Sequence, residues 1–140
     1  EASQAGVYID MVVRGICCLR AGVPDETENI HIISIVGRYL EHSRIYIFGQ
    51  GERARYYIGS ADWMTRSTLR RVEIAAPVTA PALKARLQHI FDTMLADNCN
   101  ARVQQPDGSY VRRMPGADAV DCQAQFYEEA YQANVHSSLK

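Results

Sequence analysis

The sequence predicts an α/β domain in which a mixed central sheet is flanked by helices. Short runs rich in β-branched and aromatic residues recur through the first half of the chain and are typical of strands. After Pro81 the apolar residues change to a helical spacing, which concentrates the predicted helices toward the C-terminus. A length of 140 residues, 47% of them hydrophobic and 22% charged, is typical of one globular domain, so we predict a single domain over residues 1–140.

The strand predictions rest on alternation, on β-branched runs and on turn residues. An apolar run, broken only by His31 and Ser34, predicts a buried central strand. The segment Gly49-Gln50-Gly51-Glu52 predicts a turn that joins two strands in a hairpin. The five predicted strands are residues 7–13, 30–36, 44–48, 55–58 and 71–75, the last of which we expect Pro77 to end.

The second half of the chain is predicted to hold two helices and a short hairpin. Pro81 suits the first turn of a helix, in which six apolar residues share one face: Leu83, Leu87, Ile90, Phe91, Met94 and Leu95. The segment Pro106-Asp107-Gly108 predicts the turn of a hairpin over residues 102–113. Asp118 is predicted to cap the last helix.

The first hairpin predicts a candidate site for phosphate chemistry. Residues two apart on a strand point to the same face, so His42 and Arg44 are expected to project together. Pairing of the two strands would set Arg44 opposite residues 59–60, and His42 near residues 61–62. This geometry brings together four groups: the imidazole, a fixed cation, the hydroxyl of Ser60 and the carboxylate of Asp62. Such groups can bind a phosphate and pass a proton to it.

The charge distribution favours an anion site. The net charge is −1, yet 13 of the 15 basic residues are arginine, the side chain suited to bidentate phosphate contacts. Between Arg38 and Arg71 seven arginines stand against three acidic residues, a local excess of four positive charges. A solvated strand face would explain any one of these arginines. Their clustering around His42 favours anion binding by Arg44 and Arg66.

The cysteine spacing gives no indication of a zinc site. Cys17, Cys18, Cys99 and Cys122 show no C-x-x-C spacing, and we assign no metal ligands. Adjacent cysteines do not readily form a disulfide, so we expect buried free thiols in a reducing cytoplasm. No apolar run reaches the roughly 20 residues of a membrane-spanning helix.

Three long motifs point to a known family. They cover Val12–Leu19, Ile33–Phe48 and Gly59–Arg66, and together they closely resemble the C-terminal region of bacterial polyphosphate kinase of the first type. The likeness runs from about Val7 to the last helix, so it covers most of the chain.

The resemblance implies a phospholipase D-like fold and a large multidomain, cytoplasmic enzyme. Such an enzyme reversibly transfers the terminal phosphoryl group of ATP to inorganic polyphosphate, through a phosphohistidine on a preceding domain that is absent here. The chain begins with Glu1 rather than methionine. We therefore expect a fragment that is truncated on the N-terminal side of its domain and inactive alone.

The same resemblance assigns roles to individual residues. His42 matches the second active-site histidine of the family, and we expect it to act in catalysis with Arg44. Arg14 matches an arginine that contacts ATP. From side-chain chemistry alone, we also expect Ser60, Asp62 and Arg66 to bind ATP or phosphate, and Asp62 to orient His42.

The expected partners also follow from the resemblance. They are ATP or ADP, inorganic polyphosphate, the preceding domains and, for the parent enzyme, further copies of itself. Mg²⁺ is implied as the companion of ATP, with no ligands identifiable in this chain. We expect no nucleic acid partner. Membrane association stays open for the parent, although this chain carries no membrane segment.

Two alternative functions stay open. A phospholipase D-like phosphodiesterase would carry His-x-Lys and Gly-Ser-x-Asn, whereas this chain has Arg44 and Asp62 in place of the lysine and the asparagine. A non-catalytic module that binds polyanions or serves assembly would also explain the arginine excess. Within the kinase pattern, Ala21 replaces a common proline and residues 67–69 replace a segment usually like Asn-Leu-Asp.

Overall fold

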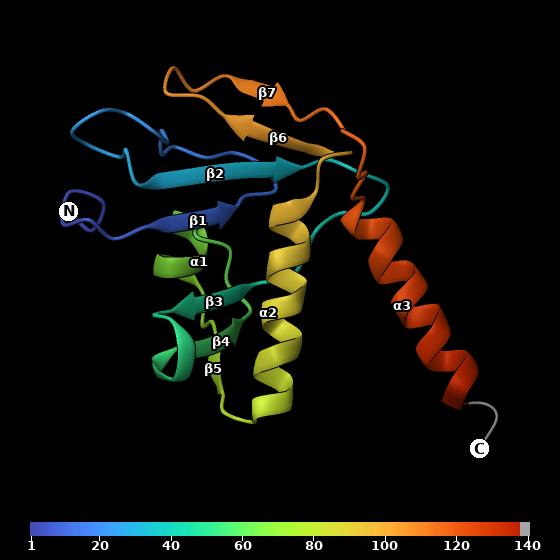
Figure 1. Ribbon diagram of the computed structural model, residues 1–140. Helices are drawn as coiled ribbons and strands as arrows, with labels where there is room; N and C mark the ends of the chain where they lie inside the picture. The colour runs from blue at the N-terminus through green and yellow to red at the C-terminus, as the bar shows by residue number, and fades with distance from the viewer. Residues whose placement is uncertain (138–140) are drawn as a thin grey trace. The chain divides into compact units, whose positions relative to one another are not determined.

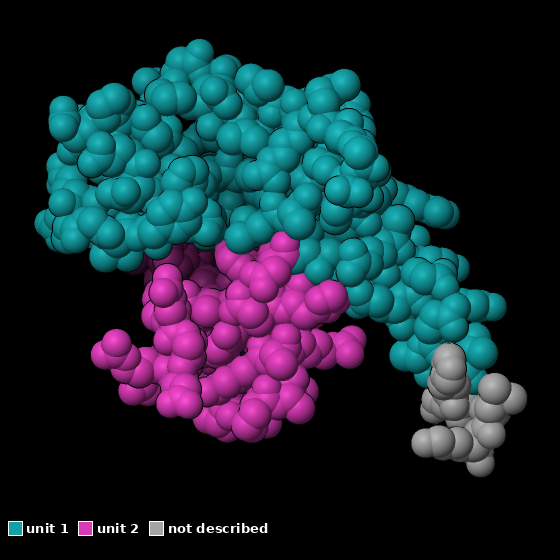
Figure 2. Space-filling view, viewed as in Figure 1, with its two compact units in different colours: residues 1–41, 93–140 teal, residues 42–92 magenta. Residues whose placement is uncertain are grey.

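The computed structural model describes the backbone of residues 1–137 and the side chains of residues 1–135. The chain forms two compact units (Figure 2). Unit 1 holds residues 1–41 and the chain from Thr93 onward, and unit 2 holds residues 42–92. Each unit has its own sheet. This grouping does not test the predicted single domain, which stays a prediction.

Unit 1 is built on a mixed sheet in the order β1-β2-β6-β7 (Figure 1). Its strands are β1 (Ile9–Val12), β2 (Ile30–Ile35), β6 (Ala101–Gln104) and β7 (Tyr110–Arg112). β1 and β2 are parallel, and the other pairs are antiparallel. The β-branched residues of β2 suit its central place, since Ile32, Ile33 and Ile35 are at most 3% exposed. Each such side chain contributes roughly 1.5–3 kcal/mol through its burial.

Unit 2 is built on an antiparallel sheet of β3 (Ile45–Phe48), β4 (Arg55–Gly59) and β5 (Ala75–Val78). The short 3₁₀ helix η1 (Gly51–Arg53) forms the turn between the first two strands. Because successive side chains alternate in direction, the paired Tyr46 and Tyr57 share one face, while the paired Ile47 and Tyr56 share the other. The hydroxyl of Tyr56 donates to Oε1 of Gln88 at 2.7 Å. This second face therefore contacts α2 (Pro81–Ala96), the helix that carries Gln88.

Three α-helices complete the part of the chain that the structure describes: α1 (Thr65–Arg70), α2 (Pro81–Ala96) and α3 (Cys122–Ser137). Together with the mixed sheet of unit 1 they confirm the predicted α/β class. The predicted start of the long helix at Pro81 is also confirmed. None of the helices in the described residues is long and apolar enough to cross a membrane.

Several sequence predictions were wrong in detail. The strand expected at residues 71–75 begins only at Ala75 and includes Pro77, which an edge strand tolerates because its missing N–H has no ladder partner. Asp121, rather than Asp118, caps α3, since its carboxylate accepts the N–H of Ala124 at 3.0 Å. Neither the helix α1 nor the division into two sheets was predicted.

The turn after α2 is organised by a buried carboxylate. Asp97 is fully buried, and its Oδ1 accepts the N–H groups of Cys99, Asn100 and Ala101 at 2.7–3.1 Å. Its Oδ2 accepts the N–H of Cys122 at 2.9 Å. Burial opposes ionisation of this carboxyl, but the backbone donors outweigh burial and hold its pKa below the ordinary value.

The thiol of Cys122 lies against the same carboxylate. Burial, followed by its hydrogen bond to Asp97 and the nearby negative charges, raises the pKa of this thiol well above its ordinary value. All four cysteines are free thiols, as expected. The expectation that they are buried holds only for Cys122, because Cys17 and Cys99 are half-buried and Cys18 is exposed.

Candidate functional site

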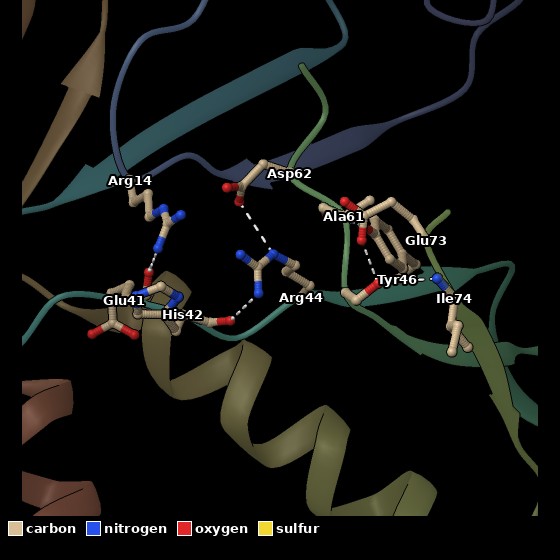
Figure 3. A network of polar contacts seen from close by, with 10 residues as sticks. Arg14, Glu41, His42, Arg44, Tyr46, Ala61, Asp62, Glu73 and Ile74 are labelled. Carbon is tan, nitrogen blue, oxygen red and sulfur yellow. Dashed lines mark hydrogen bonds and ion pairs between the residues drawn. The ribbon is translucent and has the colours of Figure 1, made fainter. Parts of the chain in front are cut away.

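Arg44 is the centre of the candidate site in unit 2. It immediately precedes β3, and its carbonyl accepts the N–H of Gly59 at 2.9 Å, as the predicted hairpin requires. Its Nε lies 3.2 Å from Oδ1 of Asp62, and its Nη1 donates to the carbonyl oxygen of His42 at 3.3 Å (Figure 3). Both side chains are mostly buried, since the exposed fraction is 23% for Arg44 and 32% for Asp62. The hairpin thus holds Arg44 between the two segments predicted to form the site.

Tyr46 supports the segment that carries Asp62. It lies on β3, two residues after Arg44, and its hydroxyl donates to the carbonyl of Ala61 at 3.1 Å. Its ring also stacks on Trp63, with centroids 5.8 Å apart and planes at 19°. Contacts on both sides of Asp62 in the chain therefore fix the backbone from which this carboxylate reaches Arg44.

Ser60 makes a structural connection rather than pointing freely into the site. Its hydroxyl donates to Oε2 of Glu73 at 2.5 Å and accepts the N–H of Ile74 at 3.0 Å. The N–H of Ser60 also donates to the carbonyl of Ile74. These bonds tie the end of β4 to the approach of β5. The role in phosphate binding predicted for Ser60 stays a prediction and would require this hydroxyl to exchange partners.

Arg14 and Glu41 belong to unit 1. Arg14 lies two residues beyond β1, and its Nη1 donates to the carbonyl oxygen of Glu41 at 2.7 Å (Figure 3). Glu41 directly precedes His42 in the chain. Arg14, predicted from the resemblance to contact ATP, therefore holds the backbone that leads into His42.

The remaining predicted site residues are exposed. The side chain of His42 is exposed in the segment before β3, which gives a ligand access to it. Arg66 is exposed in the first turn of α1. Among the predicted site residues, hydrogen bonds join Arg44 directly to Asp62 and to the backbone of His42. The orienting contact predicted from Asp62 to His42 stays a prediction.

An aromatic groove lies on the face of the unit 2 sheet that carries Tyr46 and Tyr57. It has a volume of about 490 Å³ and is lined mainly by Tyr46, Phe48, Tyr57, Trp63 and Ile74. Alternation along β3 and β4 places its strand residues on the face opposite to Tyr56 and α2. The groove, which Arg55 also lines, can accept an apolar or planar group.

The described residues do not fit a metal site of their own. No group of three or more His, Cys, Asp or Glu side chains lies close enough together among them to hold an ion. Asp62, the carboxylate of the site, has Arg44 as a neighbour at ion-pair distance. A hard cation such as Mg²⁺ prefers several oxygen ligands, which this arrangement does not provide.

Gln123 is a functional candidate that the sequence prediction missed. It lies in the first turn of α3 and bonds Tyr39, which lies 84 residues earlier in the chain and shortly before His42. No local pattern indicates such a contact. Tyr46 was also missed, although its place two residues after Arg44 on a strand was visible in the sequence.

Comparison with known proteins agrees with the predicted family. The family described as "Polyphosphate kinase C-terminal domain 2" matches residues 1–125. The polyphosphate kinase of Synechocystis sp. is 58% identical over 116 residues, which is 83% of this chain and 16% of that protein. The polyphosphate kinase of Bacillus anthracis is 49% identical over 133 residues, which is 94% of this chain and 19% of that protein.

A solved structure gives the same result. The crystal structure of polyphosphate kinase from Porphyromonas gingivalis matches with a TM-score of 0.86 at 38% identity, over 94% of this chain and 20% of that chain. The chain thus spans about a fifth or less of the length of these three relatives. The resemblance carried by the three motifs is confirmed. The chain belongs to the family of polyphosphate kinase C-terminal domains.

Proposed function

We propose that this chain is part of a polyphosphate kinase that reversibly transfers the terminal phosphoryl group of ATP to inorganic polyphosphate. The transfer proceeds through a phosphohistidine on a preceding domain, and this chain contributes the second active-site histidine, His42, with the cations beside it. By itself the chain is inactive, because it carries only half of the site. The relatives named polyphosphate kinase support this proposal.

The observation that carries the proposal is the held position of Arg44. Phosphoryl transfer depends on positioning and on neutralising charge at the transferred group and the leaving oxygen. Bonds to Asp62 and to the carbonyl of His42 fix the guanidinium before a substrate arrives. A guanidinium has five N–H donors, so the remaining ones can bind phosphate oxygens. Such a pre-positioned donor is often worth about 10²–10³ in rate.

The other residues take complementary roles. His42, exposed next to this cation, donates a proton to the departing phosphate oxygen or stabilises it as imidazolium. Arg14 supplies a second fixed cation for ATP. Asp62 holds Arg44 in place and orients the imidazole. Ser60 and Arg66 add contacts to the phosphate chain.

Magnesium belongs with the nucleotide in this proposal. The carboxylates of the described residues do not gather into an ion site. Mg²⁺ is usually held by one or two carboxylates together with substrate phosphates, so ATP and the preceding domain would supply its ligands. The parent enzyme is cytoplasmic and homo-oligomeric in this proposal.

Synthesis of polyphosphate by the parent enzyme tests the proposal. His42→Ala is expected to abolish ATP-dependent synthesis while the protein stays folded, as judged by circular dichroism. His89→Ala, which replaces another exposed histidine on α2, is the matched control and should retain synthesis. Near-wild-type synthesis by His42→Ala would remove the catalytic assignment.

Calorimetric titration of the 140-residue chain separates the alternatives. Binding of Mg-ATP that Arg14→Ala and His42→Ala both weaken would support a preformed half-site. Binding of any polyanion with a steep loss at high salt would instead indicate a general polyanion-binding module. Turnover of a chromogenic phosphodiester would indicate the phosphodiesterase, and we expect none.

A further inference from the structure

The side chain of Gln123 is bonded at both ends to one loop of unit 1. It lies in the first turn of α3 and is only 6% exposed. Its Oε1 accepts the N–H of Tyr39 at 2.9 Å, and its Nε2 donates to the carbonyl of Tyr39 at 2.8 Å. The same Nε2 donates to Oε1 of Glu41 at 2.5 Å. The amide therefore pairs with this peptide backbone as a neighbouring strand would.

The loop is shaped to receive this amide. A β-carbon on Gly37 would lie 2.5 Å from Oε1 and 2.9 Å from Cδ of Gln123, closer than real β-carbons approach other atoms. Gly37 does not have the positive φ that favours glycine. Glycine therefore suits this position because the side chain of Gln123 occupies the space that a β-carbon would need.

Apolar packing contributes little to the position of the loop. Tyr39 and Leu40 are 48% and 70% exposed. The space between the loop and α3 includes an open cavity of about 250 Å³, also lined by Phe126 and Tyr127. With so little apolar surface removed from water, the hydrogen bonds of Gln123, together with the bond from Arg14 to the carbonyl of Glu41, hold the loop in place.

The end of this loop carries the chain into the candidate site. The side chain of Glu41 accepts a hydrogen bond from Nε2 of Gln123, and its carbonyl accepts one from Nη1 of Arg14. The next residue in the chain is His42. Gln123 and Arg14 thus hold Glu41, the residue directly before the catalytic histidine.

We infer that Gln123 is a positioning residue for phosphoryl transfer: it fixes residues 37–41 and thereby the placement of His42. The inference rests on the proposed function of His42. Gln123 itself touches neither ATP nor polyphosphate in this role. It acts through the loop, because the site needs the imidazole at a defined distance from the transferred phosphate, and a displacement of about 1 Å can cost roughly 10²-fold in rate.

Gln123→Leu in the parent polyphosphate kinase is the first test. Leucine retains much of the volume but leaves the N–H and carbonyl of Tyr39 without their partner. We expect kcat for polyphosphate synthesis to fall about 10²-fold, while KM for ATP changes less than about threefold, since the loss lies in positioning for the transfer step.

Gln104→Leu is the matched control. Gln104 is also 6% exposed, and it bonds the N–H of Ala21 and the carbonyl of Leu19 in another loop of unit 1. It should lower the thermal stability by a similar amount and leave kcat within about threefold of wild type. Equal losses of kcat in the two variants would show that Gln123 is only structural and would overturn the inference.

A double-mutant cycle with His42→Ala separates this inference from the proposed function. If Gln123 acts through His42, Gln123→Leu should cause no further loss of the residual rate of His42→Ala. Multiplying losses would overturn the positioning role and leave the role of His42 standing. Near-wild-type rates in His42→Ala alone would overturn the proposed function first, and the inference with it.

Gln123→Glu adds a pH-dependent readout. A carboxylate at this position can still accept the N–H of Tyr39, but it would lie against the carbonyl of Tyr39 and the carboxylate of Glu41. A protonated acid can donate in place of the amide. The rate of this variant relative to wild type should therefore rise as the pH is lowered from 8 toward ~5.5, and a constant ratio would count against the inference.

Discussion

The ring of Tyr46 lies over Gly59 in the hairpin that carries the candidate site. A β-carbon on Gly59 would lie 2.9 Å from Cε2 of this ring and 3.4 Å from the carbonyl oxygen of Ile74. The open space at Gly59 lets the Tyr46 hydroxyl reach the carbonyl of Ala61, next to Asp62. The contact links β3, which follows Arg44, to the segment of its carboxylate partner.

Gly59→Ala should therefore disturb both stability and the stacked pair of Tyr46 and Trp63. We expect a loss of about 1–3 kcal/mol in the free energy of unfolding, as in other overpacked positions. Trp63 is the single tryptophan of the chain, so its fluorescence should also change. Gly116→Ala is the control, because a β-carbon there meets no atom within 4 Å. Equal stabilities of the two variants in urea titrations would contradict the prediction.

Arg44→Lys should abolish most of the activity of the parent enzyme although it keeps the positive charge. Lysine has no planar fork that can bond the carboxylate of Asp62 and the carbonyl of His42 while facing a phosphate. We expect kcat to fall about 10²-fold or more, measured by polyphosphate synthesis. Arg86→Lys on α2 replaces an exposed arginine and should leave kcat unchanged. Activity of Arg44→Lys close to wild type would mean that charge alone suffices.

The cysteines should differ sharply in reactivity. Cys18 is exposed, whereas Cys122 is fully buried and has a raised pKa, so little of it is the reactive thiolate at neutral pH. Iodoacetamide at pH 7.5, followed by mass spectrometry, should modify Cys18 first and Cys122 only after unfolding. Early modification of Cys122 in folded protein would contradict the described burial.

Asp97→Asn should weaken the fold at neutral pH. The variant places an N–H₂ group where the carboxylate accepts the N–H of Cys122, so a buried donor loses its acceptor. The expected loss in the free energy of unfolding is roughly 2–4 kcal/mol. Asp118→Asn, at the exposed position that does not cap α3, should change it by less than about 0.5 kcal/mol.

The same carboxylate should make stability depend on pH in the acid range. The folded-state pKa of Asp97 is lowered, so its contribution is fully present above the unfolded value of about 3.9 and is lost as the pH falls through the folded value. Wild-type stability should thus fall more steeply below about pH 4 than that of Asp97→Asn. Parallel pH profiles from thermal unfolding would contradict the assignment.

The sequence predicted the geometry of the hairpin that carries the candidate site, because local patterns determine it. The hairpin register follows from strand alternation and a glycine-rich turn, and it placed Arg44 opposite Gly59 correctly. Polar partners were harder to predict. The sequence did not indicate that the hydroxyl of Ser60 bonds Glu73, a residue that the sequence pattern had assigned to a strand.

Contacts between distant segments could not be predicted. Gln123 lies 84 residues from Tyr39, and no periodicity in either segment indicates their pairing. Asp118 and Asp121 both precede the last helix, and only the backbone path shows which of them reaches an N–H of the first turn. Propensity gives the type of an element more reliably than its end, because one turn of chain can be capped from several positions.

The carboxylate of Asp97 also has a consequence for the order in which unit 1 folds. Three of its donors lie within four residues and can reach it as soon as the turn forms, whereas the N–H of Cys122 lies 25 residues further along. The hairpin of β6 and β7 occupies the interval between them. If the carboxylate of Asp97 were buried before that hairpin had formed, it would lack the N–H of Cys122 as a donor. The turn, the hairpin and the start of α3 should therefore gain their protection from hydrogen exchange together, as one cooperative unit.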